Sequence, residues 1–136
     1  MTPPLTGFDH VHILVRDRAA ATAWYRDVMG MAPMAEYLGW AAGGGRRAFD
    51  PADASGRVHI ALFERAPAPG NKAVVALGAE AAAFVQWRDH LKRALGRDVA
   101  VVDHELSLSL YFSDPDGNPY EITTCENAAA RTAAAG

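Results

Sequence analysis

Residues 109–122, SLYFSDPDGNPYEI, are typical of two strands joined by a tight turn. In the turn, residues 114–118, Pro fixes φ and Gly permits a positive φ. Because side chains alternate along a strand, every second residue from Tyr120 to Thr124 shares one face, and Glu121 lies on the other. A carboxylate in the middle of a strand is costly to bury unless it is solvated, paired or bound to a metal. Glu121 therefore indicates a functional site on the wetter face.

The start of the chain offers a matching group. In residues 8–15, FDHVHILV, apolar residues alternate with His10 and His12, so the two imidazoles share the face opposite the core. A His on the first strand and Glu121 on the last, both on polar faces, predict a shared site.

Length, charge and cysteine content restrict the class of protein. The 136 residues suffice for one domain with a real core but not for two independent domains. A formal net charge of −3 without a basic run gives no long-range attraction to nucleic acid or to an anionic membrane. Cys125 is the single cysteine, which excludes an intrachain disulfide and favours a reducing compartment. Residues 1–6 lack the features of a secretory signal, so we expect a cytoplasmic protein without a membrane span.

The order of the expected elements repeats after about 60 residues. The first module, residues 7–65, is expected to form a strand, a helix and three strands, at 8–15, 17–29, 34–40, 46–49 and 57–64. A Pro-rich linker follows at 66–71. The second module, residues 72–125, repeats this order at 73–79, 80–95, 99–102, 106–113 and 119–124. The Ala-rich tail, residues 126–136, is expected to fray, with an added helical turn as the alternative.

These expectations describe an α+β protein made of two βαβββ modules within a single domain, residues 1–136. Neither curved four-stranded sheet can close alone. We therefore expect the modules to pair side by side as an eight-stranded open barrel around a cleft that both line. This pairing would bring His10 and Glu121 to the same cavity.

The duplicated plan resembles the vicinal oxygen chelate superfamily, which includes glyoxalases, bleomycin-resistance proteins, methylmalonyl-CoA epimerases and extradiol dioxygenases. Three motifs carry the resemblance, which covers residues 8–125: Asp9-His10-Val11, Trp24-Tyr25-Arg26-Asp27 with Gly30, and Asp114-Pro115-Asp116-Gly117-Asn118 with Glu121.

The resemblance implies metal ligands at four strand positions, which fall here on His10, Ala61, Val74 (or Ala73) and Glu121. Ala61 and Val74 cannot bind a metal. His59, two residues before Ala61 on the same face, can complete a two-His, one-carboxylate set of the kind that holds Fe(II) or Mn(II) with open positions. The expected cofactor is therefore a divalent ion (Fe, Mn, Ni or Zn), or none if the missing ligands abolish binding.

The end of the chain also resembles extradiol dioxygenases, in which a His and a Tyr precede the metal-binding Glu at set distances. Here His104 and Tyr111 lie 17 and 10 residues before Glu121. The resemblance implies that Tyr111 hydrogen-bonds a substrate phenolate and that His104 assists proton transfer. His12 is expected to line the cleft and contact the substrate.

Three functions stay open at this point. The first is a metal-dependent enzyme, most similar to an extradiol dioxygenase, that acts on a small oxygenated substrate. The second is a metal-free small-molecule binder like the bleomycin-resistance proteins, which the missing ligands at Ala61 and Val74 favour. A glyoxalase-type lyase or isomerase is disfavoured, because Ala61 removes the carboxylate that serves as a second base. Proteins of this plan often pair, so a homodimer is expected.

Overall fold

The computed structural model describes residues 2–35, 38 and 51–135. The chain divides into two compact units, residues 1–68 and 69–136. Most of the expected strand at 34–40 and all of the one at 46–49 lie outside the described residues. Within the described part of the chain, no helix has the length and apolar character needed to cross a bilayer.

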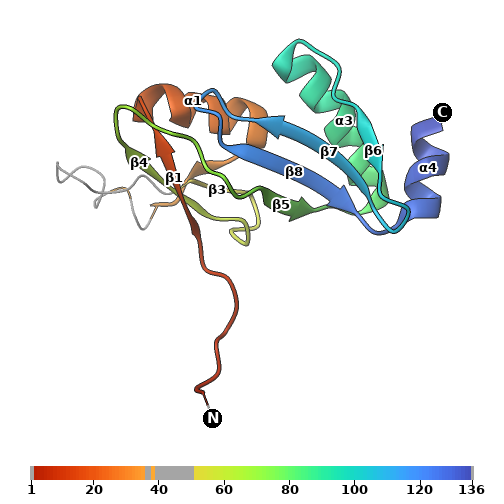
Figure 1. Ribbon diagram of the computed structural model, residues 1–136, viewed down its shortest axis with the longest axis horizontal. Coiled ribbons are helices and arrows are strands. Elements are labelled where there is room, and N and C mark those ends of the chain that lie inside the picture. The colour runs from red at the N-terminus through yellow and green to blue at the C-terminus, as the bar shows by residue number, and fades with distance from the viewer. Residues whose placement is uncertain (1, 36–37, 39–50, 136) are drawn as a thin grey trace. The chain divides into compact units, whose positions relative to one another are not determined.

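In the first unit the described elements follow the expected order of one strand, one helix and three strands (Figure 1). They are β1 (Val11–Val15), α1 (Arg18–Met29), β2 (Ala32–Pro33), β3 (Pro51–Ala52) and β4 (Ile60–Glu64). β1 and β4 pair in parallel, with Val11 opposite Ile60, whereas β2 and β3 pair antiparallel. An isolated bridge between Ala52 and His59 connects β3 to the start of β4.

Both ends of α1 are capped. The Asp17 side chain accepts a hydrogen bond of 2.9 Å from the backbone N–H of Ala20, and Gly30 ends the helix with a φ of 66°. The buried face of α1 carries Tyr25, which is 0% exposed, whereas Trp24 is only partly buried. Tyr25, rather than Trp24, is therefore the large aromatic of this core.

The pairing of β2 with β3 is confined to two residues on each strand. Pro33 lies opposite Pro51, and neither proline has an N–H to donate to the ladder. The four-stranded sheet expected for this module is therefore not continuous over the described residues. The turn expected at 51–56 begins later, because Pro51 and Ala52 belong to β3.

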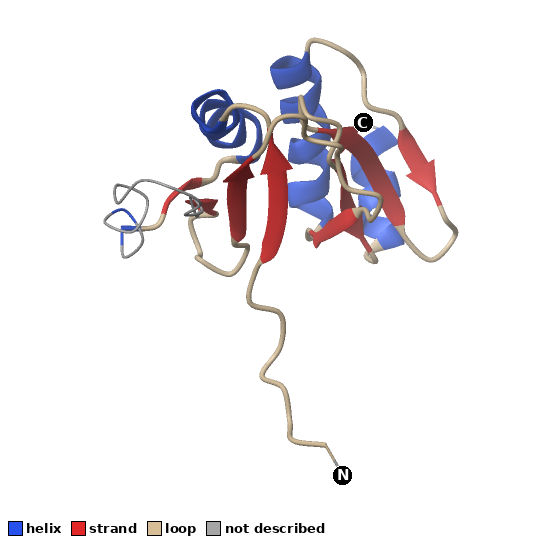
Figure 2. Cartoon of the chain, turned by 60° about the vertical axis from the view of Figure 1, so that its left-hand side comes forward, coloured by secondary structure: helices blue, strands red, loops and turns tan. Residues whose placement is uncertain are grey.

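The second unit repeats the order with β5 (Val75–Gly78), α3 (Ala81–Leu95), β6 (Val101–Asp103), β7 (Leu108–Ser113) and β8 (Pro119–Thr124). These strands form one sheet in the order β5-β8-β7-β6, with β5 parallel to β8 and the other pairs antiparallel. Figure 2 shows α3 along one face of this sheet. The unit is therefore a sheet with a helix on one face and polar side chains on the other.

The alternation expected along β8 is confirmed. Tyr120, Ile122 and Thr124 are buried, whereas Glu121 is only partly buried. From α3, Phe84 enters the core and is 0% exposed. Trp87 and Leu95 are only partly buried, while Ala81 and Leu91 are buried.

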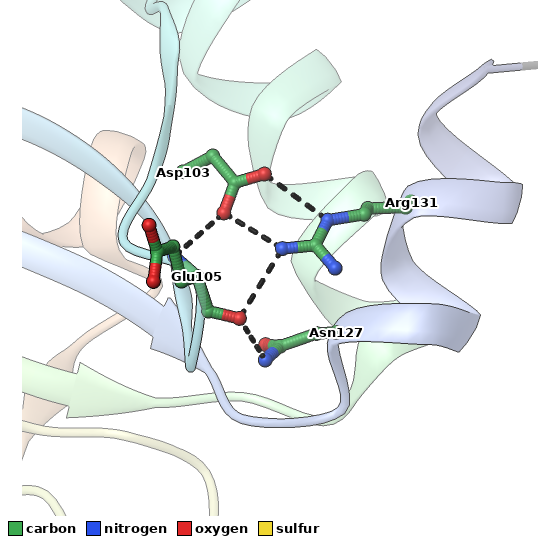
Figure 3. Close-up of polar contacts among 4 residues, drawn as sticks. All are labelled: Asp103, Glu105, Asn127 and Arg131. Atoms are coloured by element: carbon green, nitrogen blue, oxygen red, sulfur yellow. Dashed lines mark hydrogen bonds and ion pairs between the residues drawn. The ribbon is translucent and has the colours of Figure 1, made fainter.

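The C-terminal tail is helical rather than frayed. Residues Asn127–Ala135 form α4, which packs against α3 and buries Ala130 completely. Alanine has the highest helix propensity, and the small side chain of Ala130 permits close packing. Arg131 also anchors the helix, since its guanidinium holds the carboxylate of Asp103 through two hydrogen bonds of 2.7 and 3.1 Å (Figure 3). These tertiary contacts stabilise a helix too short to be stable alone.

The turns before β4 and β8 have the same pattern of backbone hydrogen bonds, as expected for duplicated modules. In each turn an Asp backbone N–H bonds a carbonyl beyond the turn, and a Gly with positive φ donates back to that Asp. The Asp–Gly pairs are Asp53 with Gly56 and Asp114 with Gly117. The Asp114 carboxylate also accepts from the backbone and side-chain N–H groups of the fully buried Asn118, at 2.8 Å each. Both turns fix where the following strand begins.

Replacing Phe84 with Ala tests the core of the second unit. We expect Phe84→Ala to lower the free energy of unfolding by about 3–5 kcal/mol, because it leaves a cavity under the sheet. Urea denaturation measures this change. Gln86→Ala, at an exposed position of the same helix, is the control and is expected to stay within about 0.5 kcal/mol of the wild type. Equal effects of the two substitutions would contradict this core.

The docking of α4 is expected to depend on pH. The hydrogen bond from Arg131, assisted by the backbone N–H of Glu105, holds the pKa of Asp103 below its usual value. The stabilisation is therefore fully present above the unfolded-state pKa of about 3.9 and is lost as the pH falls through the lower folded-state value. The difference in unfolding free energy between wild type and Asp103→Asn measures it. That difference should be constant from about pH 5 to 7 and shrink below about pH 4; a difference that grows on acidification would contradict this pairing.

Candidate functional site

Three histidines and one aspartate gather where β1 begins, and we call them the imidazole cluster: Asp9, His10, His12 and His59. Ligand atoms of Asp9, His10 and His59 all lie within 4.8 Å of one another. The rings of His10 and His12 stack with their centroids 4.9 Å apart, and His59 lies 5.4 Å from His10. The strand pattern explains this grouping: His10 and His12 alternate with the buried β1 residues, and His59 directly precedes β4, which pairs with β1.

The hydrogen bonds of His10 define its protonation pattern. Its Nδ1 lies 2.5 Å from Asp9 Oδ2, and its Nε2 lies 2.9 Å from Nε2 of His12. The hydrogen bond from His10 holds the pKa of the Asp9 carboxyl below its usual value, so this group is an ionised acceptor. Nδ1 of His10 must therefore carry a proton. In the neutral ring, Nε2 then has a free lone pair that faces His12.

This donor set suits a divalent metal ion. A carboxylate that orients the Nδ1–H of a histidine and leaves its Nε2 to the ion is a common arrangement at metal centres. The donor types of Asp9, His10 and His59 thus fit an ion such as Mn(II), Fe(II), Ni(II) or Zn(II).

A second polar group lies on the open face of β7 and β8 in the other unit. Ser109, which is fully buried, donates a hydrogen bond of 2.5 Å to Oε1 of Glu121, and its oxygen lies 3.1 Å from Oγ1 of Thr123. Ser109 pairs with Thr123 across the strands, two pairs along from Tyr111 and Glu121 and therefore on the same face. The serine therefore orients the carboxylate, whose other lone pairs can accept from a ligand.

Tyr111 pairs directly with Glu121 across the strands, so their side chains share one face. Its hydroxyl lies 3.0 Å from Nε2 of His104, in the loop between β6 and β7, and the two rings meet edge to face. Tyr111 is 39% exposed, so this pair is open to a ligand. The structure brings together Glu121, Tyr111 and His104, as the sequence motif predicts.

The registers of the two units show why two ligand positions are blank. In the first unit Ala61 of β4 lies opposite His12, and in the second unit Glu121 of β8 lies opposite Ala76 of β5. Ala61 therefore occupies the register position in its unit that Glu121 occupies in the other. Ala61 is 1% exposed and Val74, just before β5, is 48% exposed; neither carries a donor atom. The first unit thus carries imidazoles and the second carries a carboxylate.

The sequence analysis did not identify two residues of these polar groups, Asp9 and Ser109. Asp9 belongs to the motif around His10 but was not predicted to bind its ring, because adjacent residues of a regular strand point to opposite faces. Asp9 precedes β1, where this rule does not apply. Ser109 was expected only as part of a strand. Ser109 lies two residues before Tyr111 on the same strand, so alternation places it on the face of Glu121. This spacing could have identified it from the sequence.

The chain is a duplicated α+β protein of two βαβββ units. The first unit carries histidines where β1 begins, and the second carries a carboxylate on β8. The model of the Glyoxalase/Bleomycin resistance protein/Dioxygenase superfamily matches residues 7–122. The chain therefore belongs to this superfamily, which confirms the resemblance stated from the motifs.

Solved structures with similar folds include a protein assigned to the glyoxalase family from Bacillus anthracis, with 20% identity, a TM-score of 0.73, and coverage of 93% of this chain and 100% of that chain. The fosfomycin resistance protein FosX from Mesorhizobium loti has 20% identity and a TM-score of 0.64, covering 89% and 93%. A mutant of FosX from Listeria monocytogenes, complexed with Mn(II) and 1S,2S-dihydroxypropylphosphonic acid, has 16% identity and a TM-score of 0.68, covering 93% and 97%. No curated protein sequence gives a significant match.

Proposed function

We propose that this protein is a metal-dependent enzyme that acts on a small molecule with adjacent oxygen atoms, in the manner of an extradiol dioxygenase. The observation that carries this proposal is the convergence of Asp9, His10 and His59 within 4.8 Å. His10 and His59 each offer a nitrogen donor to a divalent ion, and Asp9 orients His10; one carboxylate ligand more completes a set that leaves positions for a substrate.

In this proposal the two modules pair around a cleft, so that Glu121 joins His10 and His59 at the ion. Ser109 keeps the carboxylate of Glu121 oriented, and Asp9 holds the Nδ1–H of His10, so that Nε2 is the nitrogen left to bind the ion. When bound, the ion acts as a Lewis acid that stabilises negative charge on a substrate oxygen. His12 lines the same cleft and contacts the substrate.

Tyr111 and His104 handle protons beside the carboxylate. A proton can pass between the hydroxyl of Tyr111 and Nε2 of His104, which lie 3.0 Å apart. A substrate hydroxyl that approaches Tyr111 can therefore lose its proton to the pair, with His104 as the general base. The phenol of Tyr111 then donates a hydrogen bond to the substrate oxygen that has become negative.

The relatives support a ligand of this class. The Listeria FosX structure holds Mn(II) together with a dihydroxypropylphosphonic acid, a molecule with hydroxyls on adjacent carbons. A second FosX structure from that organism also holds Mn(II). A vicinal pair of oxygens beside a divalent ion is the arrangement proposed here.

A metal-free small-molecule binder is the second candidate. Ala61 and Val74 support it, because both occupy positions where the superfamily resemblance implies a ligand. In that case the polar groups of both units would bind a ligand directly. We propose a cytoplasmic homodimer for either function, and the exposed, unpaired Cys125 agrees with a reducing compartment.

Metal affinity separates the two candidates. We expect the wild type to bind one Mn(II) or Fe(II) per chain, and His10→Ala and Glu121→Ala each to weaken binding at least about 10-fold, because each removes a ligand. Isothermal titration calorimetry on protein purified without chelator measures this. His90→Ala, in α3 and outside both polar groups, is the matched control. A wild type that binds no ion would favour the metal-free binder, and an unaffected Glu121→Ala would exclude a site shared by both modules.

The proton-transfer role is tested with catechols. We expect Fe(II)-loaded protein to consume oxygen with a catechol, and Tyr111→Phe to lower kcat by about 100-fold or more, since it removes the hydroxyl that transfers the proton. Oxygen uptake and the absorbance of the ring-cleaved product report the rate. Ser113→Ala, an exposed position on the same strand and face, is expected to keep full activity. Equal kcat values for Tyr111→Phe and wild type would remove Tyr111 from the mechanism.

A further inference from the structure

The loop that carries His104 is attached to the C-terminal helix on both sides of this histidine (Figure 3). On one side, the guanidinium of Arg131 holds Asp103 through two hydrogen bonds of 2.7 and 3.1 Å. On the other side, the carbonyl oxygen of Glu105 accepts from Nη2 of Arg131 at 3.3 Å and from Nδ2 of Asn127 at 2.9 Å. Residues 103 and 105 are thus both fixed to α4, with His104 between them.

The backbone of this loop needs such support. Glu105 has a φ of 68°, in the left-handed region that favours glycine and is costly for a residue with a Cβ. Three hydrogen bonds within the loop maintain this conformation. They run from the N–H of Glu105 to Oδ1 of Asp103 (2.8 Å), from the N–H of Leu106 to the carbonyl of His104 (2.8 Å), and from the N–H of His104 to the carbonyl of Ser107 (2.9 Å).

Asp103 is central to both sets of bonds. Its Oδ1 accepts from Arg131 and also from the N–H of Glu105, so one carboxylate joins the helix to the strained residue. Arg131 is therefore bound to the loop at two points, the carboxylate of Asp103 and the backbone carbonyl of Glu105. A planar guanidinium satisfies both acceptors at once, which an ammonium cannot do with the same geometry.

We propose that Arg131 is a positioning residue, which keeps Nε2 of His104 within hydrogen-bond reach of the Tyr111 hydroxyl by holding Asp103 and the Glu105 carbonyl. The catalytic consequence rests on the proposed function, whereas the positioning itself exists without substrate or metal. The C-terminal helix is thus part of the support of the site, and its removal disorders the His104–Tyr111 pair.

Nitrogen NMR of the imidazole rings tests this positioning directly. Tyr111→Phe supplies the reference spectrum of His104 without its partner. We expect the Nε2 resonance of His104 in Arg131→Ala to move from the wild-type value to that of Tyr111→Phe. The rings of His10, His12, His59 and His90 should keep their resonances. Arg93→Ala, an exposed arginine on α3, is the control and should leave His104 unchanged.

Two further variants test the proposal even if α4 unfolds in Arg131→Ala. Asp103→Asn leaves the helix sequence intact and should produce the same movement of the His104 resonance. Arg131→Lys keeps the charge but not the paired donors and should give an intermediate value. The proposal is overturned if His104 keeps its wild-type resonance in both Arg131→Ala and Asp103→Asn. It is also overturned if all five histidines move together in Asp103→Asn, which would indicate a general loss of structure.

Activity is the second readout. With the Fe(II)-loaded protein and a catechol, Arg131→Ala should lower kcat about 10-fold with KM unchanged, because substrate binding is kept and only the proton transfer is affected. An inactive wild type would reject the proposed function but leave the NMR result standing. An altered KM with an unaltered kcat would instead assign Arg131 to substrate binding and overturn the positioning role.

Discussion

Side chains alternate between the two faces of a strand, and this alternation determines where both polar groups lie. When the apolar residues of two paired strands enter the core, the residues between them must lie on the opposite face. In β7 and β8 the core takes Leu110 and Ile122, which lie opposite each other, so the next pair along, Tyr111 and Glu121, must share the other face. The same rule in β1 buries Ile13 and leaves the histidines on the opposite side. A slip of one residue in either register would place the polar groups in the core and the apolar groups in water. The packing of the core therefore also fixes the chemistry of the open face.

Duplication gives each unit a strand pair with one polar face, and the two polar faces carry different side chains. The first unit keeps imidazoles and has Ala61 at the register position where the second has Glu121. The second unit keeps the acid together with a Tyr–His pair and has Val74 where the superfamily resemblance implies a metal ligand. In our proposal neither unit alone holds a complete metal and proton-transfer site. In that proposal the function requires both modules.

Local rules were sufficient to predict α1 and α3 from sequence, because Asp17, Gly30 and Gly96 mark their ends through short-range hydrogen bonds and glycine geometry. Strand alternation likewise predicted which faces carry His10, Tyr111 and Glu121. Contacts between distant residues could not be predicted in this way. The helix at the C-terminus depends on burial of Ala130, and the choice of Tyr25 over Trp24 for the core depends on where α1 meets its sheet. Spacing alone carries no information on either contact.

The central claim is that the imidazole cluster and Glu121 bind one ion together. Paramagnetic broadening by Mn(II) in the amide NMR spectrum of the ¹⁵N-labelled protein measures this most directly, since it identifies every segment near the ion. The account predicts that substoichiometric Mn(II) broadens the amides of residues 9–12 and 59–61 and, in parallel, those of residues 109–111 and 120–122. Broadening confined to the first unit, or absent from both, would contradict it.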